Sequence, residues 1–98
     1  MSIVALIEHA VLQPTQTDDD LRAACRLCIE AGTASVCVKP SMAPLAAELL
    51  AGSTVVPSTV IGFPHGGTST GAKVRETEIA CGDGVREVDM VVNLGRVL

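Results

Sequence analysis

Polar and apolar side chains alternate in the last apolar segment of the chain, residues 87–94. Glu87, Asp89 and Asn93 fall on one face of a strand by the two-residue repeat, whereas Val88 and Met90 fall on the other. A partly desolvated carboxylate on a strand is suited to acid–base chemistry. The pattern fits a strand whose inner side lines a site at a barrel mouth, and it also fits an edge strand with one solvated face.

Two cysteines form a CxxC motif, Cys25 and Cys28, but its position favours packing over redox chemistry. In thiol oxidoreductases the attacking cysteine lies at a helix N-terminus, which lowers its pKa. Here both cysteines fall in the middle of an expected helix, on its apolar stripe. A zinc site would need two more close ligands, and the other candidates have no matching spacing: Cys37, Cys81, His9 and His65.

The segment from His65 to Thr70 precedes an expected helix and contains two adjacent glycines. Free helix amides next to glycines can hold an anion. The segment lacks the Gly-Lys-Ser/Thr of a P-loop, so a loop at the mouth of a barrel is the favoured interpretation. The sequence leaves open whether His65 caps this loop or faces the pocket.

Four short apolar segments alternate with three helical ones, which predicts the order β-α-β-α-β-α-β. This alternation, with short connections, requires a parallel sheet with right-handed crossovers. Pro57 is expected to confine the regular part of the third strand to residues 58–63. The predicted strands lie in residues 3–12, 33–38, 55–63 and 87–94, and the predicted helices, with their caps, in residues 17–32, 41–51 and 71–81.

The caps of the first helix are the clearest local signals. Thr17 can accept from the free amides at the N-terminus, and Asp20, three residues on, can reach back to the Thr17 backbone. Gly32 can adopt the left-handed conformation that ends a helix.

Composition excludes several classes of function. The chain has 98 residues, a net charge of −4, 48% hydrophobic residues and one aromatic residue, Phe63. A core of aliphatic residues suits strands buried in a parallel sheet. The seven Lys and Arg are scattered, and no apolar run approaches a membrane span, so we expect no nucleic-acid or membrane partner. The N-terminus lacks a basic segment, so we expect a cytoplasmic protein with reduced cysteines.

Four segments resemble the strand motifs of one enzyme family, in the same order and spacing. They are EHAVLQP (residues 8–14), ASVCVKP (34–40), VIGFPHG (60–66) and EVDMVVN (87–93). The family is deoxyribose-phosphate aldolase. The resemblance implies a (β/α)8 TIM barrel and a class I aldolase, which reversibly cleaves 2-deoxy-D-ribose 5-phosphate to glyceraldehyde 3-phosphate and acetaldehyde. A lysine Schiff base carries the reaction, and no metal or other cofactor is implied.

The resemblance also implies roles for individual residues. Asp89 matches the family's catalytic aspartate, a proton-relay residue that works beside lysine ammonium groups. Cys37 matches a thiol lining the substrate pocket, and it fits a small core residue equally well. By strand parity, not by the resemblance, Lys39 lies on the same side, where it can point into the pocket and, if desolvated, form an imine. Only two lysines are present, Lys39 and Lys73. We expect Lys73 to be a solvated helix charge. The family's Schiff-base lysine, its partner lysine and its phosphate site belong to later strands, and residues 1–98 hold no match for them.

The first two motifs depart from the family pattern. Glu8 stands where the family usually has Asp, and Ala10 where it usually has Thr. Gln13 and Lys39 replace the common Lys and Asn. These changes remove or displace polar groups near the mouth of the expected barrel.

Residues 1–98 are therefore expected to form the N-terminal half of a TIM-barrel aldolase domain, a half-barrel of about four parallel strands and three helices. A complete barrel takes about 250 residues. The open edges of a half-barrel invite pairing with another chain, so we expect a homo-oligomer, aggregation or poor folding. The alternative to an aldolase acting on sugar phosphate and aldehyde substrates is a catalytically inactive fragment that folds or assembles with a partner chain.

Overall fold

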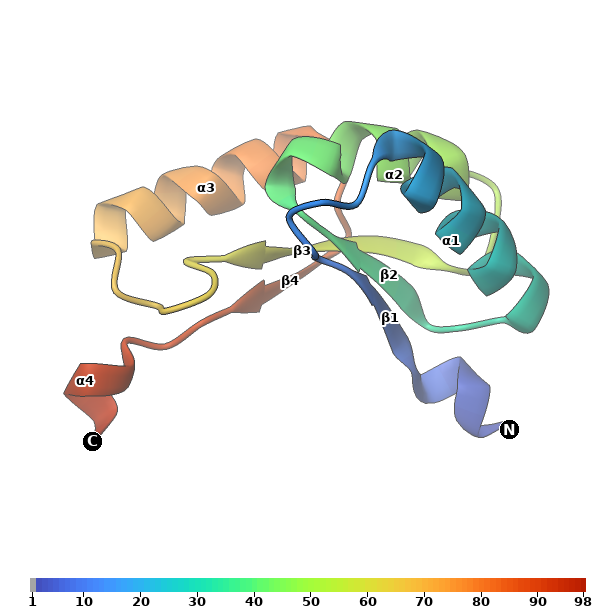
Figure 1. Ribbon diagram of the computed structural model, residues 1–98. Helices are drawn as coiled ribbons and strands as arrows, with labels where there is room; N and C mark the ends of the chain where they lie inside the picture. Colours follow the sequence, from blue (N-terminus) through green and yellow to red (C-terminus); the bar gives the residue numbers. More distant parts are fainter. Residues whose placement is uncertain (1) are drawn as a thin grey trace.

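A parallel sheet covered on one face by helices forms the structure, a computed structural model that describes residues 2–98 (Figure 1). The strands are β1 (Glu8–Val11), β2 (Ser35–Val38), β3 (Val56–Ile61) and β4 (Glu87–Met90). The main helices are α1 (Asp18–Ala31), α2 (Ala43–Leu50) and α3 (Thr70–Gly82). Short helical turns complete the chain: η1 (Ile3–Leu6), η2 (Pro40–Met42) and α4 (Leu94–Val97).

Each new strand along the chain is added at the same edge of the sheet. Its order is β1-β2-β3-β4, and every neighbouring pair is parallel. Figure 1 shows α1, α2 and α3 on the same side of the sheet, with the other side uncovered. A doubly wound sheet would reverse its strand order and carry helices on both faces, whereas a (β/α)8 barrel has this single direction. The predicted half-barrel of four parallel strands is therefore confirmed.

The core lies between the sheet and its helices. Every second residue of the strands points into it, and Val11, Val36, Val38 and Ile61 are completely buried. Helices α1 and α2 cover them with small and aliphatic side chains, among them Leu21, Cys25, Cys28, Ala46 and Leu50. The packing interpretation of the CxxC motif is thus confirmed. Burial raises the pKa of the Cys25 thiol, which opposes redox chemistry there.

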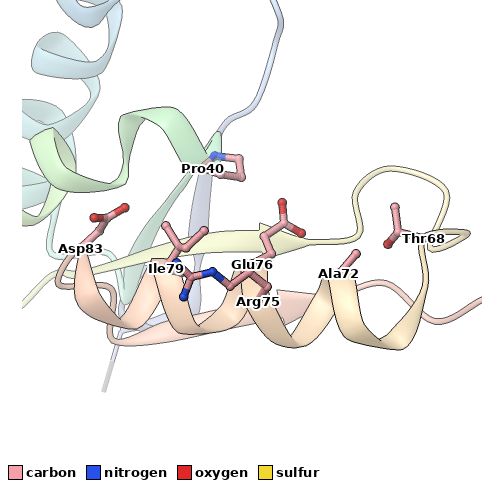
Figure 2. Close-up of a pocket in the computed structure, with 8 residues that line it drawn as sticks. Pro40, Thr68, Ala72, Arg75, Glu76, Ile79 and Asp83 are labelled. Carbon is pink, nitrogen blue, oxygen red and sulfur yellow. The ribbon is translucent and has the colours of Figure 1, made fainter.

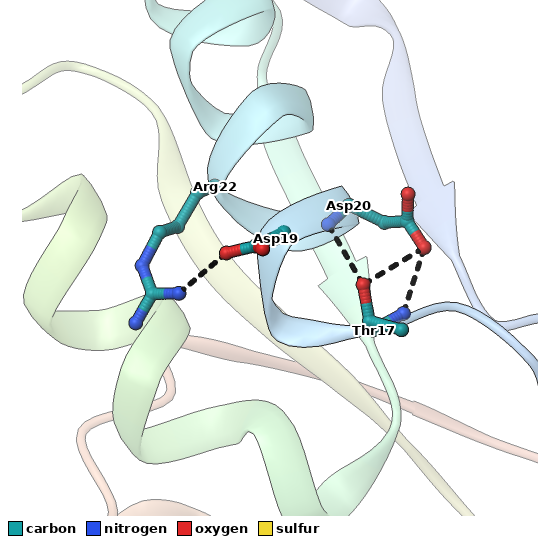
Figure 3. A network of polar contacts seen from close by, with 4 residues as sticks. All are labelled: Thr17, Asp19, Asp20 and Arg22. Atoms are coloured by element: carbon teal, nitrogen blue, oxygen red, sulfur yellow. Dashed lines mark hydrogen bonds and ion pairs between the residues drawn. The ribbon is translucent and has the colours of Figure 1, made fainter.

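Both ends of α1 follow the sequence signals closely, and Figure 3 shows the contacts at its N-terminal end. The Thr17 side chain accepts from the Asp20 amide at 3.3 Å, and the Thr17 amide donates to the Asp20 carboxylate at 2.8 Å. Gly32 ends the helix with φ of +79°. These local hydrogen bonds fix where α1 begins and ends, and so fix the loop between β1 and α1.

The first strand lies within the segment predicted for it, whereas the fourth is shorter than expected. In the predicted segment 3–12, Ile3–Leu6 form a 3₁₀ turn and pairing with β2 starts at Glu8, because a strand needs a neighbour. The predicted fourth strand ran to residue 94, but β4 ends at Met90, opposite the last residue of β3, and α4 begins at Leu94.

Pro57 does not delay the start of β3, contrary to the prediction. Val56 bonds toward β2, since its amide donates to the Ala34 carbonyl at 3.1 Å. The next residue, Pro57, therefore faces β4, where its carbonyl accepts from Arg86 at 2.9 Å. Because pairing of β3 with β4 begins one residue later, at Ser58, the missing proline N–H removes no ladder bond.

None of the helices in residues 2–98 has the length and hydrophobicity that crossing a membrane requires.

Candidate active site

The face of the sheet that the helices leave uncovered carries the polar side chains of the strands. Residues paired across parallel strands point to the same face. The register pairs Ala10 with Cys37, and Cys37 with Ser58. Glu8 lies two residues before Ala10 and points the same way. These side chains define what we call the inner face.

Asp89 belongs to the inner face, as the alternation in the fourth strand predicted. Its strand neighbour Glu87 is paired with Ser58, and Asp89 follows by two residues. The Cys37 Sγ lies 3.8 Å from the Asp89 Oδ2. Ser58 donates a hydrogen bond from its hydroxyl to the Glu8 carboxylate. The Asp89 side chain is therefore turned away from the helices.

The inner face is strongly concave. Four neighbouring strands of a flat sheet would place β1 and β4 about 14 Å apart. Yet three side-chain atoms lie within 4.8 Å of one another: a carboxylate oxygen of Glu8 on β1, the sulfur of Cys37 on β2 and a carboxylate oxygen of Asp89 on β4. Side chains from both edges meet because the sheet curls toward its uncovered face, as a barrel wall does.

Acidic neighbours shape the electrostatics of Asp89. Partial burial raises the pKa of Asp89 above its ordinary 3.8, and the adjacent Glu8 carboxylate raises it further. The contact with Cys37 lowers this pKa, and the more distant Glu87 raises it. The resemblance implied that ammonium groups hold Asp89 ionised, but among residues 2–98 its charged neighbours are acids.

Cys37 is a protonated thiol at neutral pH. Burial raises the pKa of Cys37 to about 11, and the nearby Glu8 and Asp89 carboxylates add to this effect while Ser58 opposes it. Its sulfur is therefore neither a nucleophile nor a strong base at neutral pH. Cys37 can line a pocket and donate weakly to Asp89.

The chain is similar in sequence to curated deoxyribose-phosphate aldolases. The chain is 44% identical over 97 residues to deoxyribose-phosphate aldolase 1 of Cutibacterium acnes, covering 99% of this chain and 45% of that protein. It is 46% identical over 93 residues to deoxyribose-phosphate aldolase of Rhodopirellula baltica, covering 95% of this chain and 39% of that protein. Over almost its whole length, the chain is thus similar to deoxyribose-phosphate aldolases. It spans less than half the length of these curated aldolases. No family model matches the sequence.

Solved aldolase structures share the fold. A putative deoxyribose-phosphate aldolase from Coccidioides immitis superposes with a TM-score of 0.91 at 37% identity, covering 93% of this chain and 36% of that one. The deoxyribose phosphate aldolase of Aeropyrum pernix, described as a tetramer, superposes with a TM-score of 0.89 at 26% identity, covering 96% of this chain and 40% of that one. The four strands therefore correspond to part of an aldolase barrel.

Lys39 lies at the carboxyl end of β2 but does not contact Asp89. Its ammonium donates to the backbone carbonyls of Gln16 at 2.9 Å and Pro14 at 3.3 Å. It thus ties the loop between β1 and α1 to the end of β2. The Lys39 amine is therefore engaged in hydrogen bonds to backbone carbonyls of this loop.

Ser58 is a site residue that the sequence reasoning missed. It is completely buried at the centre of the inner face. Its hydroxyl donates to the Glu8 carboxylate and lies 3.4 Å from a second acceptor, the Val36 carbonyl. The available signal was a polar residue inside an apolar strand, at a position that points to the same face as Cys37 of the neighbouring strand. Glu8 was noted only as a departure from the aldolase pattern, whereas the structure makes it a direct neighbour of Asp89.

The same cluster supplies a set of potential metal ligands within residues 2–98: Glu8, Cys37 and Asp89. The spacing of cysteines and histidines gives no sign of this set, because two of its three ligands are carboxylates. Binding a cation there would require the Cys37 thiol to lose its proton, despite a pKa of about 11.

A hollow of about 420 Å³ lies on the opposite, helical side of the sheet (Figure 2). It runs along α3, with Glu76, Ile79 and Asp83 below and Pro40 of η2 above. It contains no residue of the inner face, so it is separate from the candidate site.

His65 is exposed on the loop between β3 and α3.

Proposed function

We propose that residues 1–98 form the N-terminal half of a deoxyribose-phosphate aldolase barrel and supply its acid–base group, Asp89. The observation that carries this proposal is the meeting of Asp89 with Glu8 and Cys37 on the concave inner face. Active sites of TIM barrels lie inside the barrel mouth, where strand residues converge. The similarity to named aldolases along the whole chain supports the same assignment.

The proposed reaction is the reversible cleavage of 2-deoxy-D-ribose 5-phosphate. A lysine amine adds to the substrate aldehyde and, with loss of water, forms an iminium. Removal of the proton from the C3 hydroxyl breaks the C2–C3 bond. The electron pair of that bond moves into the iminium and gives an enamine. Glyceraldehyde 3-phosphate leaves. Protonation and hydrolysis of the enamine then release acetaldehyde and restore the lysine. Asp89 carries protons in these steps.

The lysine of this reaction comes, in our proposal, from outside residues 1–98. Lys39 is held by the carbonyls of Pro14 and Gln16, and Lys73 by the carbonyl of Val91 at 2.8 Å. Neither amine lies beside Asp89. The paired acids Glu8 and Asp89 suit an incoming ammonium group, which would lower the pKa of Asp89 again and ionise it.

The first experiment traps the Schiff base. A chimera is built in which residues 1–98 replace the matching segment of the Cutibacterium acnes aldolase, and deoxyribose 5-phosphate and borohydride are added. We expect an intact-mass adduct on a lysine of the Cutibacterium acnes part of the chimera, and none on residues 1–98 alone. A soluble, folded chimera without an adduct would contradict the proposal, and so would an adduct on Lys39 of the isolated chain.

A second candidate is an inactive fragment that assembles with a partner chain. The open edges of the sheet favour it, because β1 and β4 each lack one neighbour. Apolar side chains beside both edges are exposed, including Ile3 and Leu6 before β1, and Met90 and Val92 at β4. We propose that the isolated chain forms homo-oligomers or aggregates through these edges. Sedimentation showing a stable monomer at all concentrations would contradict this.

The proposed substrates also set a location and partners. Sugar phosphates are charged and are held inside cells, so we propose a cytoplasmic protein whose ligands are a sugar phosphate and aldehydes. We propose no nucleic-acid or membrane partner, since the net charge is −4 and the basic residues are scattered. Cell fractionation followed by immunodetection tests the location, and detection in the membrane fraction would contradict it.

A further inference from the structure

Lys73 is not the solvated helix charge that the sequence suggested. Its side chain is half-buried and donates from Nζ to the Val91 carbonyl at 2.8 Å. Its stem passes over Gly62, where an added Cβ would lie 2.8 Å from the Lys73 Cε. The absence of a side chain at Gly62, whose φ is +67°, therefore lets the lysine cross the end of β3.

Glu76, one helical turn after Lys73, makes the complementary contact. Its carboxylate accepts from the Gly62 amide at 2.8 Å. Residues three apart lie on one face of a helix, so α3 presents a cation and an anion side by side toward the sheet. The anion binds the amide just past β3, and the cation binds the carbonyl just past β4.

These contacts stand where the strand ladder stops. The Val91 amide still donates to the Ile61 carbonyl at 2.9 Å, but β3 ends at Ile61 and the chain turns away. The Val91 carbonyl is then bonded by Lys73 instead of a strand amide. Asp89 lies only two residues before Val91, so the position of its backbone depends on how firmly this end of β4 is held.

We propose that Lys73 and Glu76 are positioning residues that clamp the carboxyl ends of β3 and β4, and thereby keep the Asp89 carboxylate against Glu8 and Cys37. This inference rests on the proposed function for its catalytic meaning, but its test reads the site directly and needs no turnover. Failure of the Schiff-base trapping and failure of the clamp are therefore separate outcomes.

The test combines hydrogen exchange with a pH titration by NMR, carried out on the soluble homo-oligomer that the isolated chain is proposed to form. Lys73→Met removes the ammonium and keeps most of the stem. We expect the Val91 amide to exchange about tenfold faster or more, as for loss of a charge-assisted hydrogen bond. We also expect the titration midpoint of Asp89 to fall toward its ordinary 3.8, because the carboxylate becomes more exposed to water and moves away from Glu8. Lys73→Arg, which keeps a donor, should restore most of both properties.

Two controls separate positioning from general stability. Arg75→Met removes an exposed charge from the same helix, where Arg75 pairs with Glu78, and should leave both readouts unchanged. Val55→Ala opens a cavity in the core and should lower the melting temperature without moving the Asp89 midpoint. If Lys73→Met does not fold, Lys73→Gln is read in the same way. An unchanged Asp89 midpoint and Val91 exchange in the folded Lys73 variant would overturn the proposal, as would an equal shift in Val55→Ala.

Discussion

The Cys37 Sγ lies 3.8 Å from the Asp89 Oδ2, although the two residues are 52 positions apart and a whole strand separates β2 from β4. Strands two places apart in a flat sheet lie about 9.5 Å from each other. The two side chains meet because the sheet is curved toward its open face. The same curvature brings Ser58 of β3 to Glu8 of β1. A few polar residues thus report the barrel geometry directly.

The Asp89 carboxyl predicts how stability depends on pH. Its pKa is raised in the folded chain, so protonated Asp89 favours folding below the ordinary value of 3.8, and this contribution is lost as pH rises through the folded pKa. Asp89→Asn should therefore melt at a higher temperature than the parent chain at pH 7, and the difference should shrink below pH 4. Circular dichroism melts from pH 3.5 to 7 measure it. A parent chain more stable than Asp89→Asn at pH 7 would contradict the raised pKa.

Cys37 should react slowly with thiol reagents. Its pKa of about 11 leaves it protonated at pH 7.4, and it is buried, whereas Cys81 is exposed on α3. Mass spectrometry after a short iodoacetamide pulse should find Cys81 labelled well before Cys37. Asp89→Asn removes one cause of the raised pKa, so it should speed labelling of Cys37 while that of Cys81 stays the same. Equal rates for the two cysteines in the parent chain would refute this description.

Gly66 should resist substitution. Its φ is +72°, and a Cβ there would overlap the Val92 carbonyl, so the loop between β3 and α3 lies directly on the segment after β4. Gly66→Ala should lower the free energy of unfolding by at least about 2 kcal/mol, from strain and displacement of the loop. Gly67→Ala is the matched control, because a Cβ at Gly67 meets nothing within 4 Å. Urea denaturation that finds equal losses for both variants would contradict the packing.

The capping box of α1 makes a smaller, local contribution. Thr17→Ala removes the side-chain acceptor of the Asp20 amide and should cost about 0.5–2 kcal/mol of unfolding free energy. Thr17→Ser keeps the hydroxyl and should cost much less. Urea denaturation of the three chains measures both values, and a Thr17→Ala variant as stable as the parent would show that water replaces the cap without loss.

Local signals were the predictable part of this fold. Thr17 and Gly32 mark the ends of α1 because their hydrogen bonds and dihedral angles involve residues close in sequence. The alternation around Asp89 correctly predicted its face, since parity is a property of one strand. Strand lengths were predicted less well, because Glu8 and Met90 become strand ends only through the position of a neighbouring strand.

The polar partners of the site could not be read from one segment at a time. Ser58 meets Glu8 across 50 residues, and Lys73 meets Val91 across 18. Each pair depends on sheet curvature or on the packing of α3, which a linear pattern does not encode. The resemblance to the aldolases supplied the expected role of Asp89, but it gave no sign that Glu8 would raise the pKa of that carboxyl.

The central claim is that Asp89 is the proton-carrying group of an aldolase site, and its most direct test is turnover by the chimera of residues 1–98 with the remaining part of the Cutibacterium acnes aldolase. We predict that Asp89→Asn lowers kcat/KM for deoxyribose 5-phosphate by about hundredfold or more, the usual contribution of a general acid–base group, with the fold intact. Glu87→Gln, a neighbouring carboxylate at the start of the same strand, should stay within about threefold of the parent. An Asp89→Asn chimera that cleaves the substrate as fast as the parent would contradict the account.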